Sequence, residues 1–211
     1  MTEFLLLRHG ESTWNAEHRW QGQSDPPLTR RGEQQARDAV ASLVELGPFD
    51  AVVASNLQRA RRTGELLAQG ASLELGPAVA ALAERYASAW EGLTADEIEL
   101  RYPGYLAAGR RPDGYEGDGE VVERVCRAIA SLAERHPGGR VLVVSHGGVI
   151  GALEQMDAEG EGEPTGHRTG NLEGRWLAAD PAGVRMVGDH VRLLLAGDDH
   201  AEPGAGTGEY V

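Results

Sequence analysis

Apolar residues follow two patterns along this chain. Uninterrupted apolar runs at 4–7, 51–54 and 141–144 each stop at a charged or hydroxyl-bearing residue, which is typical of buried strands. Apolar residues at helical spacing, bounded by capping residues or by glycine and proline, predict helices over 29–46, 57–69, 94–102, 120–136 and about 147–156. A short strand is predicted between 71 and 92, and the segments 171–179 and 184–192 are predicted to form a hairpin through a turn at 180–183.

The alternation of strands and helices predicts the fold class. Such an order favours an α/β protein with a mostly parallel sheet covered on both faces, that is, a three-layer α/β/α sandwich. The final hairpin would add an antiparallel edge to this sheet. We expect one catalytic domain over 1–195, a loop over the site at 103–119, a solvated acidic loop at 157–166 and a disordered acidic tail at 196–211.

Two of the predicted strands end in a histidine. His9 follows the first apolar run and is preceded by Arg8, and His146 follows the run at 141–144. Ligands of open α/β sheets bind outside the carboxyl ends of the strands, so both imidazoles are expected in that crevice. Arg59 lies in the first turn of the helix after the 51–54 run and is expected at the same rim. Imidazoles beside guanidinium groups and a helix N-terminus are suited to phosphate binding and proton transfer.

Composition narrows the classes of function. The formal net charge of −13 and the pI near 4.9 disfavour a nucleic-acid partner, which would normally meet a basic face. The sequence contains no lysine, which excludes a P-loop lysine and a Schiff-base enzyme. Cys126 is the only cysteine and cannot form an internal disulfide, and no signal peptide or membrane-spanning apolar run is found. We therefore expect a cytoplasmic protein with no membrane partner.

The residues around the two histidines also resemble a known family. Arg8-His9-Gly10 after a first strand is similar to the signature of the histidine phosphatase superfamily, which includes phosphoglycerate mutases, fructose-2,6-bisphosphatases and small phosphomonoesterases. The resemblance extends over about residues 3–153, and more loosely to about 195. The further matches follow in family order: Asn15, Leu28-Thr29-x-x-Gly32, Gln35-Ala36, Ser55-x-Leu57-x-Arg59-Ala60-x-x-Thr63, Glu84-Arg85, Trp90-Glu91-Gly92 and Ser145-His146-Gly147-Gly148.

The chain departs from the family pattern at two places. Ala87-Ser88 stand where the family usually has an aromatic residue followed by glycine. Gly119-Glu120-Val121 stand where the family often has Gly-Glu-Ser, so that a hydroxyl is missing.

The resemblance implies a role for each catalytic candidate. It implies that His9 attacks phosphorus to form a phosphohistidine, that Arg8 and Arg59 hold the non-bridging oxygens, and that His146 stabilises the transferring phosphoryl group. It implies that Glu84 protonates the leaving oxygen and then activates water. Because the arginines neutralise the phosphate charge, neither a metal nor another cofactor is expected.

The substrate-binding candidates lie around this core. Asn15 and Gln21 could donate further hydrogen bonds to the phosphoryl group, and Gly147 follows His146 directly. Arg110 and Arg111 lie in the segment 103–119. Their side chains could contact an anionic substrate or could equally be solvated.

We therefore predict a metal-independent phosphomonoesterase of the histidine acid type that acts on a small phosphorylated metabolite. The first alternative is a cofactor-dependent phosphoglycerate mutase, which needs a closed, dry site. The short span 93–119 and the acidic tail favour an open site, and hence hydrolysis. A phospho-ligand-binding module without activity, and a metal-dependent hydrolase using both histidines and carboxylates, are further alternatives. The sequence does not specify an oligomeric state, and a homodimer is one candidate.

Overall fold

The computed structural model describes residues 1–160 and 169–193, and within these ranges six strands form one mixed sheet in the order β3-β2-β4-β1-β5-β6. Strands β3, β2, β4 and β1 are parallel, whereas β5 pairs antiparallel with β1 and β6 pairs antiparallel with β5. The mostly parallel sheet with an antiparallel edge is therefore confirmed. The strands are β1 (Thr2–Arg8), β2 (Ala51–Ser55), β3 (Leu75–Val79), β4 (Arg140–Ser145), β5 (Glu173–Asp180) and β6 (Gly183–Arg192).

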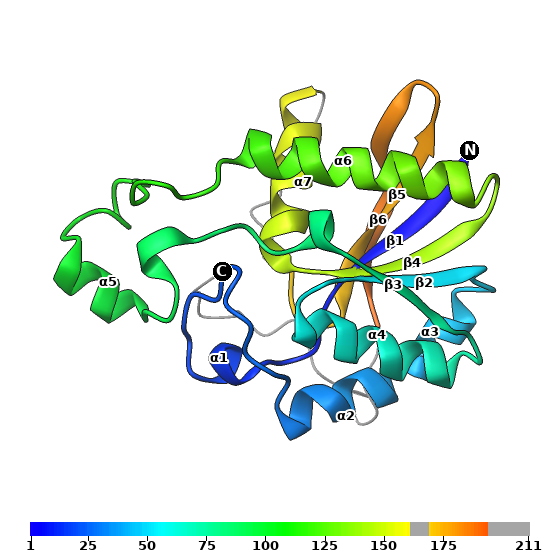
Figure 1. Cartoon of the computed structure of the whole chain (residues 1–211), viewed down its shortest axis with the longest axis horizontal. Coiled ribbons are helices and arrows are strands. Elements are labelled where there is room, and N and C mark those ends of the chain that lie inside the picture. The colour runs from blue at the N-terminus through cyan, green and yellow to red at the C-terminus, as the bar shows by residue number, and fades with distance from the viewer. Residues whose placement is uncertain (161–168, 194–211) are drawn as a thin grey trace.

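Helices cover both faces of the sheet and complete the three predicted layers (Figure 1). Phe4 and Leu6 pack with α6 and α7 on one face, and Leu5 and Leu7 pack with α3 and α4 on the other. All four side chains are fully buried, which explains why the first apolar run is uninterrupted rather than alternating. The helices of the two outer layers are α2 (Arg30–Asp38), α3 (Val40–Glu45), α4 (Gln58–Gly70), α6 (Asp118–Arg135) and α7 (Gly147–Gly160).

The predicted helix 29–46 is two helices. Thr29 caps α2 by accepting a hydrogen bond from the Gly32 amide at 2.9 Å, as expected of an N-cap threonine. The backbone changes direction at Ala39, which ends α2 and begins α3. In α3, Leu43 is buried against the sheet, whereas the next residue, Val44, is 57% exposed.

Two further boundaries differ from the prediction. Helix α6 begins at Asp118, and Gly117 is its N-cap residue. Val121 is fully buried in the core of the protein. Helix α7 runs to Gly160, so the predicted loop 157–166 is wrong in its first part, and residues 161–166 and the predicted tail at 196–211 lie outside the described residues.

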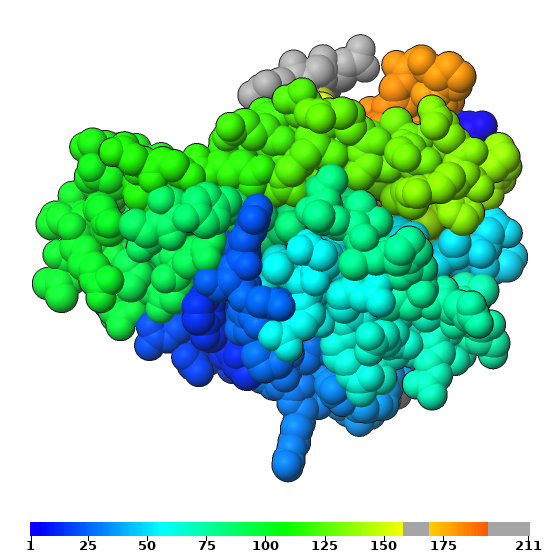
Figure 2. All heavy atoms as spheres, viewed as in Figure 1, coloured from blue at the N-terminus to red at the C-terminus, as the bar shows by residue number. Residues whose placement is uncertain are grey.

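Residues 86–117 form a small cap that extends beyond the end of the sheet (Figure 1). The cap contains the 3₁₀ helix η2 (Ser88–Trp90) and helix α5 (Ala95–Arg101). Its core is aromatic: the buried rings of Trp20 and Trp90 meet edge to face with centroids 5.6 Å apart. In Figure 2 the blue segment after β1 lies between the green cap and the cyan part of the body.

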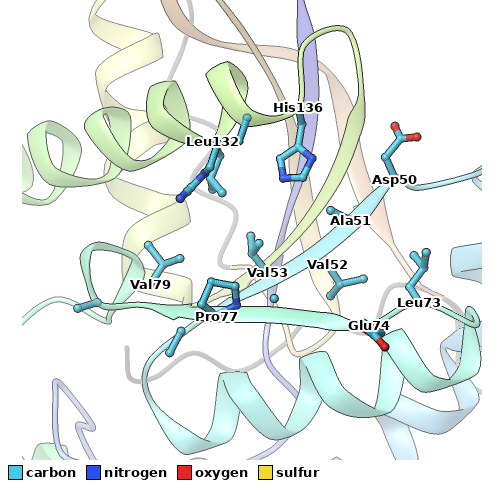
Figure 3. A pocket seen from close by; sticks show the side chains of 14 residues that line it. Asp50, Ala51, Val52, Val53, Leu73, Glu74, Pro77, Val79, Leu132 and His136 are labelled. Carbon is cyan, nitrogen blue, oxygen red and sulfur yellow. The ribbon is translucent and has the colours of Figure 1, made fainter.

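A cavity of about 590 Å³ lies elsewhere, between β2, β3 and the end of α6. Figure 3 shows apolar side chains such as Val53, Val79 and Leu132 around it. None of the candidate catalytic or substrate-binding residues lines this cavity. Among the described residues, no helix combines the length and apolar content that crossing a bilayer requires.

Candidate active site

The two strand-end histidines lie side by side. Strands β1 and β4 are adjacent and pair Arg8 with Ser145, so the next residue on each strand reaches the same point. The His9 amide donates to the Ser145 carbonyl at 3.1 Å. The imidazole centroids of His9 and His146 are 5.2 Å apart, with their planes inclined by 63°. The carboxyl end of the sheet thus brings together the two imidazoles expected there, both almost completely buried.

Hydrogen bonds fix which nitrogen of His9 carries the proton. His9 Nδ1 lies 2.6 Å from the Gly10 carbonyl oxygen, and a carbonyl can only accept, so Nδ1 is the protonated nitrogen. His9 Nε2 consequently presents a lone pair and accepts from Arg59 Nε at 3.2 Å. Burial lowers the pKa of His9 well below its usual 6.5, and the positive charges of Arg59 and Arg8 lower it further. The ring is therefore neutral at neutral pH.

Arg59 lies fully buried in the first turn of α4, where the sequence places it. Its Nη1 donates to the Ser24 carbonyl at 2.8 Å and its Nη2 to the Gly22 carbonyl at 2.9 Å. A guanidinium has five N–H donors, so each Nη retains one donor for a further acceptor. Burial lowers the Arg59 pKa to about 10, while the negative charge of Glu84 acts in the opposite direction. The side chain therefore stays cationic at neutral pH.

His146 has one engaged and one orphaned nitrogen. Its Nε2 lies 2.8 Å from the Ser55 hydroxyl, whereas its Nδ1 is buried and has no hydrogen-bond partner within the described part of the chain. Burial, followed by the positive charge of Arg59, lowers the His146 pKa well below 6.5. A buried polar atom without a partner costs about 1–3 kcal/mol. Such an atom in a native structure is a candidate for ligand contact.

Glu84 follows the 3₁₀ helix η1 (Ala80–Leu82) and lies at the N-terminus of α7. Its Oε2 accepts from the Gly148 amide at 3.1 Å and its Oε1 from the Arg85 amide at 2.7 Å. The side chain is 8% exposed. The carboxyl group is thus fixed at the site by backbone amides on two segments.

Arg8 and Gly147 lie against each other. Arg8 Nη1 donates to the Thr169 carbonyl at 2.6 Å. A Cβ at position 147 would lie 3.4 Å from side-chain atoms of Arg8, which is van der Waals contact. The Arg8 side chain therefore lies directly against the start of α7.

Asn15 and Gln21 use their amide oxygens within the protein. Helix α1 (Thr13–Ala16) is capped by Ser12, and Asn15 Oδ1 accepts from the Ser12 amide at 3.1 Å. Gln21 Oε1 lies 2.7 Å from the Ser12 hydroxyl, which donates to it. The amide nitrogens of both side chains are the groups that could bind a ligand.

Arg110 and Arg111 lie in the cap and are exposed. Arg110 stacks over Tyr105 at 4.2 Å, and Arg111 lies 5.4 Å from the Trp90 ring centroid and 5.5 Å from that of Tyr115. Their hydrogen bonds are with Tyr105 and with the cap backbone. The structure thus does not join these arginines directly to His9, Arg59, His146 or Glu84.

Three supporting residues were missing from the sequence-based site. Arg124 on α6 donates to the carbonyls of Ala81 at 2.7 Å and Ala83 at 2.8 Å, and so fixes the segment that carries Glu84. Ser55 contacts His146, and Asn171 Nδ2 donates to the His9 carbonyl at 2.8 Å. Ser55 belongs to a matched motif, but Arg124 and Asn171 carry no signal that separates them from other surface polar residues. Among the described residues, no group of three or more His, Cys, Asp or Glu side chains is placed to hold a metal ion.

Comparisons with known proteins identify the family of the chain. Residues 4–167 match the family model of the histidine phosphatase superfamily (branch 1). The chain is 41% identical over 159 residues to "Probable phosphoglycerate mutase GpmB" of Escherichia fergusonii. The aligned part covers 72% of this chain and 73% of that protein.

Solved structures show the same fold. The mycobacterial glucosyl-3-phosphoglycerate phosphatase in complex with VO3 is similar with a TM-score of 0.77 and 28% identity, over 88% of this chain and 96% of that one. Bacillus stearothermophilus YhfR is similar with a TM-score of 0.76 and 28% identity, over 88% and 95% of the two chains.

Proposed function

Because this chain belongs to the histidine phosphatase superfamily, we propose that it is a metal-independent phosphomonoesterase that acts through a phosphohistidine at His9. The observation that carries the proposal is the orientation of His9. Its Nδ1 proton is held by the Gly10 carbonyl at 2.6 Å, so the Nε2 lone pair is directed at the Arg59 guanidinium, 3.2 Å away. A phosphoryl group bound by Arg59 would lie in front of the nucleophilic nitrogen.

In the first step, His9 Nε2 attacks phosphorus and the bond to the leaving oxygen breaks. Arg59 and Arg8 hold the non-bridging oxygens, and the orphaned Nδ1 of His146 gains a phosphoryl oxygen as its partner. Glu84 transfers a proton to the leaving alcohol. The proton on His9 Nδ1 stays in place, and the Gly10 carbonyl stabilises the positive charge of the phosphorylated ring.

In the second step, water attacks the phosphohistidine. The Glu84 carboxylate takes a proton from this water, the P–N bond breaks, and inorganic phosphate leaves. His9 returns to its neutral form and Glu84 to its protonated form, so both groups are ready for the next cycle. The low pKa of His9 favours this return, because the buried ring disfavours a retained positive charge.

Trapping the covalent intermediate tests the proposal. A monoester labelled with ³²P is mixed with the enzyme and quenched in alkali, in which phosphohistidine survives. We expect label on the wild-type protein, none on His9→Ala, and turnover that EDTA leaves unchanged. Unlabelled protein with EDTA-sensitive turnover would instead support a metal-dependent hydrolase, and the absence of both label and turnover a binding module. Screening phosphorylated metabolites would then identify the substrate.

A phosphoglycerate mutase is the second candidate, because the curated relative that matches this chain at 41% identity carries that name. Hydrolysis is favoured because the compared structure whose name states an activity is a phosphatase, and because the span 93–119 is short. The enzyme can be given 3-phosphoglycerate with a catalytic amount of the 2,3-bisphosphate. Fast formation of 2-phosphoglycerate with little free phosphate would support the mutase.

A further inference from the structure

Glu91 lies where the cap joins the body, directly after η2. Its carboxylate accepts hydrogen bonds from a short loop of the body: Oε1 from the Gln23 amide at 2.8 Å, and Oε2 from the Ser24 amide at 3.0 Å and the Ser24 hydroxyl at 2.6 Å. Oε1 also accepts from the Ala87 amide of the cap at 3.3 Å. One side chain therefore holds the loop and the root of the cap together.

The loop is shaped to receive this carboxylate. Gly22 has a φ of +51°, and a Cβ at this position would lie 2.1 Å from Glu91 Oε1. Only glycine combines this left-handed backbone with so close an approach. Just before the loop, the Trp20 amide donates to the Leu93 carbonyl at 2.9 Å and the Gly92 amide to the Trp20 carbonyl at 2.8 Å. The carboxylate thus occupies a built position rather than a chance surface contact.

The same loop holds the phosphate-site arginine. The carbonyls of Gly22 and Ser24 accept the two Nη atoms of Arg59, whose Nε points at His9. The far end of the loop is fixed to α4, because Asp25 Oδ1 accepts from the Gln58 amide at 2.7 Å. A continuous series of contacts therefore runs from Glu91 through residues 22–24 to Arg59 and His9. The Glu91 charge also opposes the lowering of the Arg59 pKa by burial.

We propose that Glu91 is a positioning residue for phosphate binding, which fixes the Gly22 and Ser24 carbonyls so that they orient the Arg59 guanidinium toward His9 Nε2. The inference rests on the proposed function of Arg59 as a phosphate ligand. Without the carboxylate, the amides of Gln23 and Ser24 lose their acceptor and turn to water. The Gly22 carbonyl shares a peptide group with the Gln23 amide and moves with it, and the Ser24 carbonyl moves with its own residue, which also loses the hydrogen bond of its hydroxyl to Glu91. The long arginine side chain then loses the two contacts that select its rotamer.

The test is the affinity for inorganic phosphate, measured by calorimetry independently of turnover. In Glu91→Gln we expect the Kd to rise about tenfold, because charge-assisted hydrogen bonds to the loop are lost. The value of kcat/KM should fall by at least the same factor. Glu99→Gln is the matched control: Glu99 is exposed on α5 and accepts from the Gly104 amide at 2.8 Å, so its phosphate Kd should stay unchanged.

Two further variants separate positioning from general stability. Gly22→Ala displaces the same carboxylate, so its effect on the phosphate Kd should overlap with that of Glu91→Gln rather than add to it. Ser24→Ala removes only the hydroxyl that donates to Glu91 and should raise the phosphate Kd about twofold. If Glu91→Gln does not fold, this milder variant tests the positioning role in its place. In each case the melting temperature is recorded alongside the Kd, because a purely structural role would change only the former.

The outcomes distinguish this inference from the proposed function. A phosphate Kd in folded Glu91→Gln within twofold of wild type would overturn the positioning role, even if wild type hydrolyses monoesters through phosphohistidine. The positioning role would also be overturned if the effects of Gly22→Ala and Glu91→Gln on the phosphate Kd were fully additive in the double variant. Wild-type protein that neither binds phosphate nor turns over a monoester would contradict the proposed function, and the inference with it.

Discussion

His9, Arg59 and His146 stand at the ends of regular elements, whereas the cap around Trp90 is built from a 3₁₀ helix, a short helix and turns. The side chains of His9, Arg59 and His146 are at most 2% exposed, while Arg110 and Arg111 of the cap are exposed and stack on aromatic rings. Backbone pairing in the sheet fixes the two histidines, and the start of α4 with two loop carbonyls fixes Arg59. Turn hydrogen bonds of the backbone and side-chain stacking hold the cap, so that substitutions should affect the two regions in different ways.

The largest effect is expected at the strand ends. His9→Ala removes the proposed nucleophile and should lower kcat by about 10⁴-fold or more. Because Arg8 and Arg59 remain, inorganic phosphate should still bind, and calorimetry can check this. His136→Ala, at the end of α6, is the control and should retain full activity. Turnover of His9→Ala close to that of wild type would break the proposed mechanism.

The next effect concerns Glu84, at the boundary between the two regions. As the proposed general acid, it matters most when the leaving group is a poor one. Glu84→Gln should therefore slow alkyl phosphates by about 10²- to 10³-fold and an activated aryl phosphate far less. Steady-state rates on two such substrates provide the measurement. Equal losses on both would assign Glu84 another role.

The two regions also differ in how far the sequence predicts them. His9 and His146 could be placed because an apolar run fixes a strand and hence its end. Glu84 could be placed only through a motif, because it follows a 3₁₀ turn that no periodicity reveals. The partners of Arg59 are carbonyls of a loop, and Asn171 approaches His9 from 162 residues away. Contacts of backbone atoms over such separations leave no pattern in the side chains.

Acid should lower the free energy of unfolding through the two strand-end histidines. The pKa values of His9 and His146 are lowered in the folded protein, so the unfolded chain takes up protons first as the pH falls below about 6.5. The stability that these neutral rings contribute is therefore present above 6.5 and is lost as the pH falls from there toward their folded values. Urea unfolding at pH 7.5 and 5.5 should show this loss. The loss of stability between the two pH values should be smaller in His9→Ala than in wild type. An equal loss in the two proteins would contradict this prediction.

A smaller effect is expected at the first end of the cap. Ser88 has a φ of +54°, the left-handed conformation that suits the glycine usually found in the family at this place. Its hydroxyl donates to the Asp113 carbonyl at 2.6 Å. Ser88→Ala and Ser88→Gly both lose this bond, but only glycine relieves the backbone strain. The glycine variant should therefore be more stable than the alanine variant by about 1 kcal/mol, measured by urea unfolding. Equal stabilities would show that position 88 is not strained.

The smallest effect is expected at the other end of the cap, where α6 begins. Gly117 is the N-cap residue with φ −74° and ψ 160°, a conformation open to any residue, and a Cβ there would meet Glu120 Oε2 at an ordinary 3.6 Å. At present the Glu120 carboxylate accepts from the Gly117 amide at 2.8 Å, but no hydroxyl accepts from the first-turn amides. Gly117→Ser would supply one and should stabilise the protein by about 0.3 kcal/mol, whereas Gly117→Ala should be slightly less stable than the parent. Both variants should keep wild-type kcat/KM, because a Cβ at position 117 would meet only Glu120, which contacts neither His9 nor the loop that holds Arg59. If the serine variant is no more stable than the alanine variant, the Glu120 carboxylate already satisfies this helix end. A change in kcat/KM would show that this end of the cap, and not only the end that carries Glu91, is coupled to the strand-end site.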